Sequence, residues 1–229
     1  MTTFVLLHGA YQGPWIWTPV ADRLRSQGHT VYVPCLDGCG ERAAGVRPGI
    51  TTESQAEEVV EMLRLEDLSD VVLAGTSSGG MVMARVAERA RDKIARVVFA
   101  DALALQNGEK IRDIVTNPST IEGEIAIGPD RADLVNRSFK TMEPTLRDWA
   151  ADRMTLHPRA CFYEPVKLES FWDQKWDAVV IYCTQAPNPG RPHQERCAKK
   201  LNARWHEIDT DHYPMLTTPD ELARLIAEG

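Results

Sequence analysis

Residues 70–86, DVVLAGTSSGGMVMARV, decide the fold of this chain. The apolar run at 71–74 predicts a buried strand, and apolar residues spaced three and four apart from position 83 onward indicate a helix. Between them lies G-x-S-x-G, which in a strand–turn–helix context is the signature of a nucleophile elbow. The sharp turn would project the Ser77 hydroxyl above the sheet edge, and Gly75 and Gly79 avoid collisions with neighbouring backbone. The helix that follows would favour negative charge beside this serine.

On both sides of this stretch, apolar runs alternate with segments of helical spacing. In order, we expect a strand at 3–7, a helix at 17–24, a strand at 30–34, a helix from Thr52, the elbow strand and helix, and a strand at 94–100. After residue 175 come a strand at 178–182, a helix near 193–201, a strand at 204–208 and a C-terminal helix from Thr218. Such alternation indicates an α/β fold, a mainly parallel sheet with helices on both faces.

The segment 102–175 breaks this alternation. No strand is evident in it, while Phe139, Met142, Leu146 and Trp149 keep helical spacing. We interpret it as a helical cap inserted after the strand that ends at Asp101. Residues 1–101 and 176–229 would then form the core domain, and 102–175 the cap. Most aromatic side chains of the cap would pack against each other, and one or two would face a pocket, because ligand pockets are mostly apolar.

Composition limits the classes of protein to which the chain can belong. With 229 residues, 43% hydrophobic and 26% charged, it predicts one globular core rather than two domains of ordinary size. A net charge of −7 argues against nucleic acid or an anionic membrane as a partner. The N-terminus lacks the features of a signal peptide, and the five cysteines are odd in number without a C-x-x-C pair. We therefore expect a cytoplasmic protein with unpaired thiols and no metal site.

A serine nucleophile requires a base, and the base requires an orienting carboxylate. Behind an elbow of this kind the histidine is expected in the loop after the last strand, where His212 lies. His8 precedes the loop after the first strand and is expected to shape that loop. Two backbone N–H groups would form the oxyanion hole, those of Ala10 and Ser78.

Several stretches together resemble a known family. They are LLHGAYQGPWIW at 6–17, LDGCGER at 36–42, GTSSGG at 75–80, the Tyr-Cys-Thr strand end at 182–184 and DHYPML at 211–216. The chain resembles the α/β-hydrolase superfamily over nearly its whole length, and within it the small branch of plant methyl esterases, hydroxynitrile lyases and bacterial esterases. The lyases of this branch carry a threonine after the first-loop histidine and a lysine after the catalytic histidine. Gly9 and Tyr213 stand at those positions here, which favours hydrolysis.

The position of the triad carboxylate departs from the family pattern. Plant members carry it two residues beyond the Cys-Thr pair, where this chain has Ala186. Asp101 is the replacement that the resemblance suggests, because some members take the acid from the strand after the elbow helix. A purely structural role for Asp101 at the start of the cap stays open. Asp209 and Asp211 are rival candidates for the triad carboxylate, since both lie within three residues of His212.

These residues predict a cofactor-free serine hydrolase that cleaves a carboxylic ester of a small, largely apolar molecule through an acyl-enzyme. A lactone, a carbamate or a thioester would suit the same machinery. The alternative from another functional class is a ligand-binding protein that has the hydrolase fold but no catalytic activity. The expected partner is a small-molecule substrate, with no nucleic acid and no membrane, and a homodimer is left open.

Overall fold

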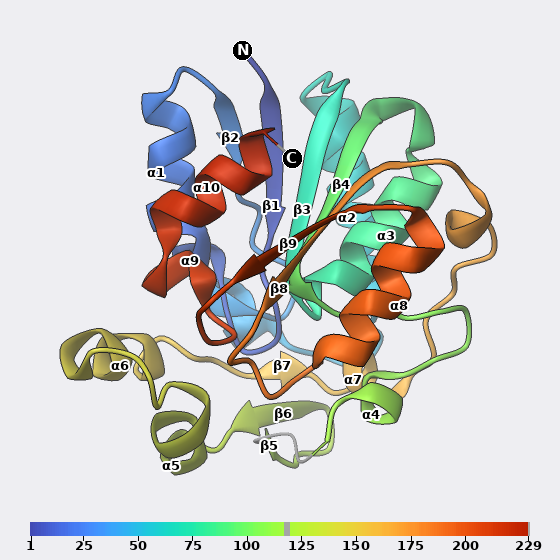
Figure 1. Ribbon diagram of the computed structural model, residues 1–229. Coiled ribbons are helices and arrows are strands. Elements are labelled where there is room, and N and C mark those ends of the chain that lie inside the picture. Colours follow the sequence, from blue (N-terminus) through green and yellow to red (C-terminus); the bar gives the residue numbers. More distant parts are fainter. Residues whose placement is uncertain (117–119, 229) are drawn as a thin grey trace.

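The computed structural model describes residues 1–116 and 120–228, and its centre is a six-stranded parallel sheet (Figure 1). The strands run in the order β2-β1-β3-β4-β8-β9. Their bounds are β1 Thr3–Leu7, β2 Thr30–Tyr32, β3 Val71–Ser77, β4 Ile94–Ala102, β8 Asp177–Cys183 and β9 Arg204–Ile208. The predicted α/β fold with a mainly parallel sheet is confirmed.

Two helical layers cover the sheet. The side chains of β1 alternate between two cores, with Val5 and Leu7 in one and Phe4 and Leu6 in the other, as the period of two in a strand requires. The first core lies under α2, α3 and α8, and the second under α1, α9 and α10. The bounds of these helices are α1 Thr18–Ser26, α2 Thr52–Leu65, α3 Gly79–Arg89, α8 Arg191–Leu201, α9 Pro214–Thr217 and α10 Pro219–Glu228.

Small differences from the expected bounds have local causes. The capping box of α2 is formed by Thr51 and Ser54, one residue before the predicted pair Thr52 and Gln55, because Thr51 has the extended backbone of an N-cap and accepts the Ser54 N–H. Short 3₁₀ helices and a π-helical turn complete the core and the cap. The 3₁₀ helices are Pro14–Trp17, Gly40–Gly45, Arg91–Lys93 and Phe171–Asp173, and the π-helical turn is Leu134–Ser138.

The cap segment 102–175, of which residues 117–119 lie outside the described residues, is not purely helical. Its helices are α4 Ile111–Ile114, α5 Arg131–Asp133, α6 Pro144–Ala151 and α7 Ala160–Tyr163. The expectation that it contains no strand is wrong, since β5 Thr120–Ile121, β6 Ala126–Pro129 and β7 His157–Pro158 pair as a small antiparallel sheet. Strands of two to four residues are too short to produce a recognisable alternating pattern.

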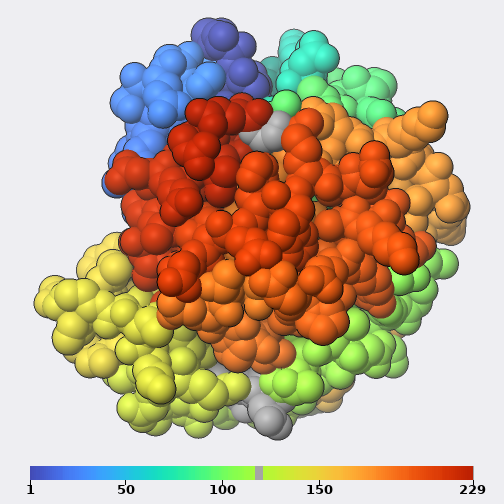
Figure 2. All heavy atoms as spheres, viewed as in Figure 1, coloured from blue at the N-terminus to red at the C-terminus, as the bar shows by residue number. Residues whose placement is uncertain are grey.

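The cap lies at the carboxyl ends of the strands (Figure 1). In the space-filling view, the C-terminal residues cover the middle of the visible face, with yellow and green cap residues below them (Figure 2). Because β1 connects to β2 on one side while β3 lies on its other side, the strand order reverses beside β1. Open α/β sheets bind ligands outside the carboxyl ends of the strands at such a reversal. The loops after β1 and β3 therefore define where a site is expected.

Candidate active site

The turn from β3 into α3 has the geometry of a nucleophile elbow. Ser77 has φ +50°, a left-handed conformation that is uncommon for a residue with a side chain. A Cβ atom on Gly75 would lie 2.8 Å from the Gly79 carbonyl oxygen, and a Cβ on Gly79 would lie 2.5 Å from that of Leu7. Neither position has room for a side chain, so the two glycines allow the turn that presents Ser77.

Asp101 lies on a β-bulge at the end of β4. Thr76 pairs with Ala100, but the next residue, Ser77, pairs with Ala102, so Asp101 is the additional residue. It has φ +46° and is fully buried. Its Oδ1 accepts a hydrogen bond from the Cys183 N–H at 3.3 Å. The bulge thus turns the Asp101 carboxylate toward β8 and the loops beyond the sheet edge.

The loop after β9 brings His212 to this carboxylate. His212 Nδ1 lies 2.5 Å from Asp101 Oδ2. Because a carboxylate accepts, Nδ1 carries the proton and donates it to the bond, which leaves Nε2 as the acceptor. Burial raises the pKa of the Asp101 carboxyl above its ordinary value, while the hydrogen bond from His212 opposes that rise. The pair is the arrangement in which a carboxylate orients an imidazole base.

Neither rival aspartate is bonded to His212 among the described contacts. Asp209 accepts hydrogen bonds from the Thr184 hydroxyl at 2.7 Å and from the Gln185 amide at 3.0 Å. Asp211 accepts the Tyr213 N–H at 2.9 Å and also bonds the Thr141 hydroxyl. Both carboxylates therefore stabilise the loop that carries His212.

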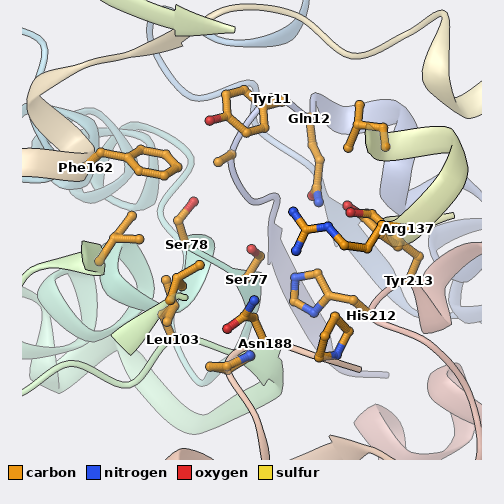
Figure 3. A pocket seen from close by; sticks show the side chains of 17 residues that line it. Tyr11, Gln12, Ser77, Ser78, Leu103, Arg137, Phe162, Asn188, His212 and Tyr213 are labelled. Atoms are coloured by element: carbon orange, nitrogen blue, oxygen red, sulfur yellow. The ribbon is translucent and has the colours of Figure 1, made fainter. Parts of the chain in front are cut away.

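Ser77, Ser78, Ala10 and His212 line one cavity beneath the cap. Figure 3 shows the Ser77 side chain beside the His212 ring, with Phe162 and Leu103 on one side and Arg137 and Tyr213 on the other. All five residues predicted for the site except Asp101 line this cavity, and Asp101 lies behind His212 as its bonded partner. The structure thus brings the predicted residues together from the loop after β1, the turn after β3, the bulge in β4 and the loop after β9.

The loop after β1 is held by side chains within it. Gln12 Oε1 accepts the Gly9 N–H at 2.8 Å. His8 Nε2 accepts the Leu36 N–H at 3.1 Å, so Nδ1 carries the proton and donates to the Gly9 carbonyl oxygen at 3.0 Å. Both His8 nitrogens are therefore occupied by backbone groups. This fits the prediction that His8 shapes the loop.

His8 carries a testable pH dependence of stability. Burial lowers the pKa of His8 to about 4, whereas an unfolded histidine has a pKa of about 6.5. Below pH 6.5 the unfolded chain binds a proton at His8, whereas the folded protein does not bind it until the pH falls to about 4. The contribution of neutral His8 to the free energy of unfolding is therefore complete above pH 6.5 and is lost as the pH falls toward 4. At pH 5 the loss is on the order of 2 kcal/mol.

Urea denaturation gives the free energy of unfolding at pH 7.5 and at pH 5. The difference between the two values contains the contribution of His8 together with those of His157 and His193, because burial also lowers the pKa of these histidines. In His8→Asn that difference should shrink by about the same 2 kcal/mol, whatever the absolute stability of the variant. An equal difference in the wild type and in His8→Asn would contradict a buried neutral His8.

Sequence reasoning did not identify several residues of the cavity wall. Tyr11 and Gln12 directly follow Ala10 in the loop after β1, the proposed oxyanion loop, and that position was a usable signal. The other unpredicted wall residues come from separate segments that only folding assembles. They are Leu103, Ile111, Val115, Leu134, Arg137, Ser138, Pro187, Asn188, Pro189 and Tyr213. Phe162 also lines the cavity, which agrees with the expectation that one or two aromatic side chains of the cap face a pocket.

Comparisons with known proteins agree with this fold. A model of the alpha/beta hydrolase family matches residues 4–225. The chain therefore belongs to the alpha/beta hydrolase family. It is 29% identical to the carbendazim hydrolyzing esterase of Nocardioides sp. (strain SG-4G), over 99% of each chain. It is 25% identical to methylesterase 2 of Arabidopsis thaliana, over 96% of this chain and 92% of that one.

Among solved structures, an extracellular alpha/beta-hydrolase from a Paenibacillus species superposes with a TM-score of 0.86 at 25% identity, covering 100% of this chain and 98% of that chain. The predicted resemblance to plant methyl esterases and bacterial esterases is confirmed. The chain is thus an alpha/beta hydrolase related to esterases. Within the described ranges, no helix is both long and apolar enough to cross a membrane.

Proposed function

We propose that the protein is a serine hydrolase that cleaves the carboxylic ester of a small, largely apolar molecule. The observation that supports this most is the 2.5 Å contact between His212 Nδ1 and Asp101 Oδ2, placed behind a cavity into which Ser77 is presented with φ +50°. A base that is oriented by a buried carboxylate, beside a serine on an elbow, is the machinery of nucleophilic acyl transfer.

The proposed reaction proceeds through an acyl-enzyme. Ser77 Oγ attacks the ester carbonyl carbon while His212 Nε2 takes the hydroxyl proton, and the backbone N–H groups of Ala10 and Ser78 stabilise the oxyanion. As the tetrahedral intermediate collapses, His212 gives the proton to the departing alcohol oxygen. Water then attacks the acyl-enzyme with His212 again as base, releasing the acid and restoring Ser77. None of these steps needs a cofactor or a metal.

The residues on the two sides of the cavity suggest where the alcohol and acyl parts of the ester bind. The leaving alcohol must lie near His212, because that residue protonates it. The acyl group then lies on the other side of Ser77, against Phe162 and Leu103 (Figure 3). Those two side chains belong to the same hydrophobic core as Tyr11 and Ile111. We therefore propose an apolar acyl group, which buries its surface there.

Two features speak against the alternatives. The side chain after His212 is Tyr213, which lines the cavity, so the position offers no lysine ammonium of the kind that the related lyases carry. Burying a carboxylate costs free energy even when it is paired. An enzyme uses the buried Asp101–His212 pair to orient its base, whereas a protein that only binds a ligand gains nothing from it. A lactone, a carbamate or a thioester remains chemically compatible with the same proposal.

A fluorophosphonate probe tests the proposal directly. We expect covalent labelling of Ser77, because an activated serine reacts with such a probe while an ordinary serine does not. Mass spectrometry of the digested protein locates the label, with Ser77→Ala as the negative control and Ser78→Ala as the matched neighbour that should still be labelled. Labelling at Ser78 would refute the assignment of Ser77 as the nucleophile, and no labelling of folded protein would refute it and favour a binding protein.

A further inference from the structure

The Tyr11 hydroxyl is buried without a hydrogen-bond partner. Tyr11 is 8% exposed, lines the cavity, and its hydroxyl oxygen has no partner among the described residues. Buried polar groups in folded proteins nearly always have one. The oxygen itself has almost no exposed surface, although Tyr11 lines the cavity, so a ligand supplies the missing partner only where the wall around Tyr11 opens to it.

The backbone holds this side chain in place at a cost. Tyr11 has φ +64°, a conformation that is unfavourable for a bulky residue. The Tyr11 carbonyl accepts the Thr155 N–H from the cap at 2.8 Å. Its ring packs against Phe162, with centroids 5.9 Å apart, and against His157, with centroids 6.0 Å apart. The ring therefore cannot turn its hydroxyl out to solvent without breaking these contacts.

Tyr11 also lies where the acyl group is proposed to bind. It follows Ala10, whose N–H would hold the oxyanion, and Figure 3 shows its hydroxyl turned toward the Phe162 side of the cavity. Burial raises the pKa of the Tyr11 phenol far above its ordinary value, so the group stays protonated and can donate. The neighbouring wall is formed by Phe162, Leu103 and Ile111, whose side chains are apolar.

We propose that Tyr11 is a specificity residue that donates a hydrogen bond to an acceptor in the acyl part of the substrate. This inference rests on the proposed esterase function and narrows its substrate class. The preferred acyl group is an apolar body with one acceptor, such as a ring nitrogen, an ether oxygen or a carbonyl. A site that contains a buried donor discriminates against an analogue without the acceptor, because the donor is then left unpaired.

Isosteric ligands test this inference independently of hydrolysis. Methyl benzoate and the three methyl pyridinecarboxylates have the same shape and differ only in one ring atom. Their Kd values are measured by calorimetry with Ser77→Ala, which cannot turn them over. We expect at least one pyridine isomer to bind about 3- to 10-fold more tightly than methyl benzoate, the range of one neutral hydrogen bond. Adding Tyr11→Phe should abolish that preference.

Matched variants separate the hydroxyl from its surroundings. Tyr163→Phe removes a cap hydroxyl that bonds Glu122 and Arg112 and should leave the preference intact. The same Kd values are measured with Tyr11→Leu, which also lacks the hydroxyl. If one of the two Tyr11 variants folds poorly, the other still decides the result. The inference is overturned if no pyridine isomer binds more tightly than methyl benzoate, or if the preference survives removal of the Tyr11 hydroxyl. Failure of the esterase proposal would show separately, as absent labelling of Ser77.

Discussion

Asp101→Asn is expected to lower kcat by about 10²- to 10⁴-fold while the protein stays folded. Asparagine keeps the shape of the side chain but can donate its amide N–H to His212 Nδ1, which favours the wrong tautomer of the imidazole. The effect is expected because the bulge in β4 directs the fully buried Asp101 carboxylate at His212, with 2.5 Å between oxygen and nitrogen.

The rival carboxylates serve as matched controls. Asp209→Asn and Asp211→Asn should each lower kcat far less, because the described contacts of both side chains are to loop groups other than His212. Steady-state kinetics on one ester, together with the Tm of each variant, gives the ranking. A larger loss in Asp209→Asn or Asp211→Asn than in Asp101→Asn would move the acid to the histidine loop. Near-full activity in all three would mean that His212 works without a carboxylate.

Gly9→Ala is expected to lower kcat by on the order of 10²-fold, because it displaces the oxyanion loop from the nucleophile. A Cβ atom at position 9 would lie 2.5 Å from Ser77 Cβ and 3.1 Å from Ser77 Oγ. The loop after β1 or the elbow must then shift, and misplacement of about 1 Å costs about 10²-fold in rate. The effect should fall on kcat more than on KM, since the oxyanion contact forms fully only in the transition state.

Gly45→Ala is the control for this substitution. A Cβ atom at position 45 meets no atom within 4 Å, so Gly45→Ala should keep wild-type kinetics. The Tm and the far-UV circular dichroism of both variants show whether they fold. A folded Gly9→Ala protein with near-full kcat would contradict the close approach of the oxyanion loop to Ser77.

Local patterns were sufficient for the core of this protein. The strands and helices of the α/β layers follow periods of two and 3.6 residues, which depend on neighbouring residues alone. The elbow was likewise readable, because its glycines at 75 and 79 are required by contacts between adjacent elements. The small sheet of the cap was missed, since strands as short as β5 and β7 carry too few residues for a period.

The sequence by itself determined the α/β fold, the elbow with Ser77 and the loop that carries His212. It left three aspartates as candidates for the acid, and only the tertiary structure distinguishes them. The contact between Asp101 and His212 spans 111 positions of the chain. It depends on a bulge in β4 and on the pairing of β4, β8 and β9. The same holds for the Tyr11 hydroxyl, because whether a polar group has a partner is settled by packing from distant segments, which no local pattern records.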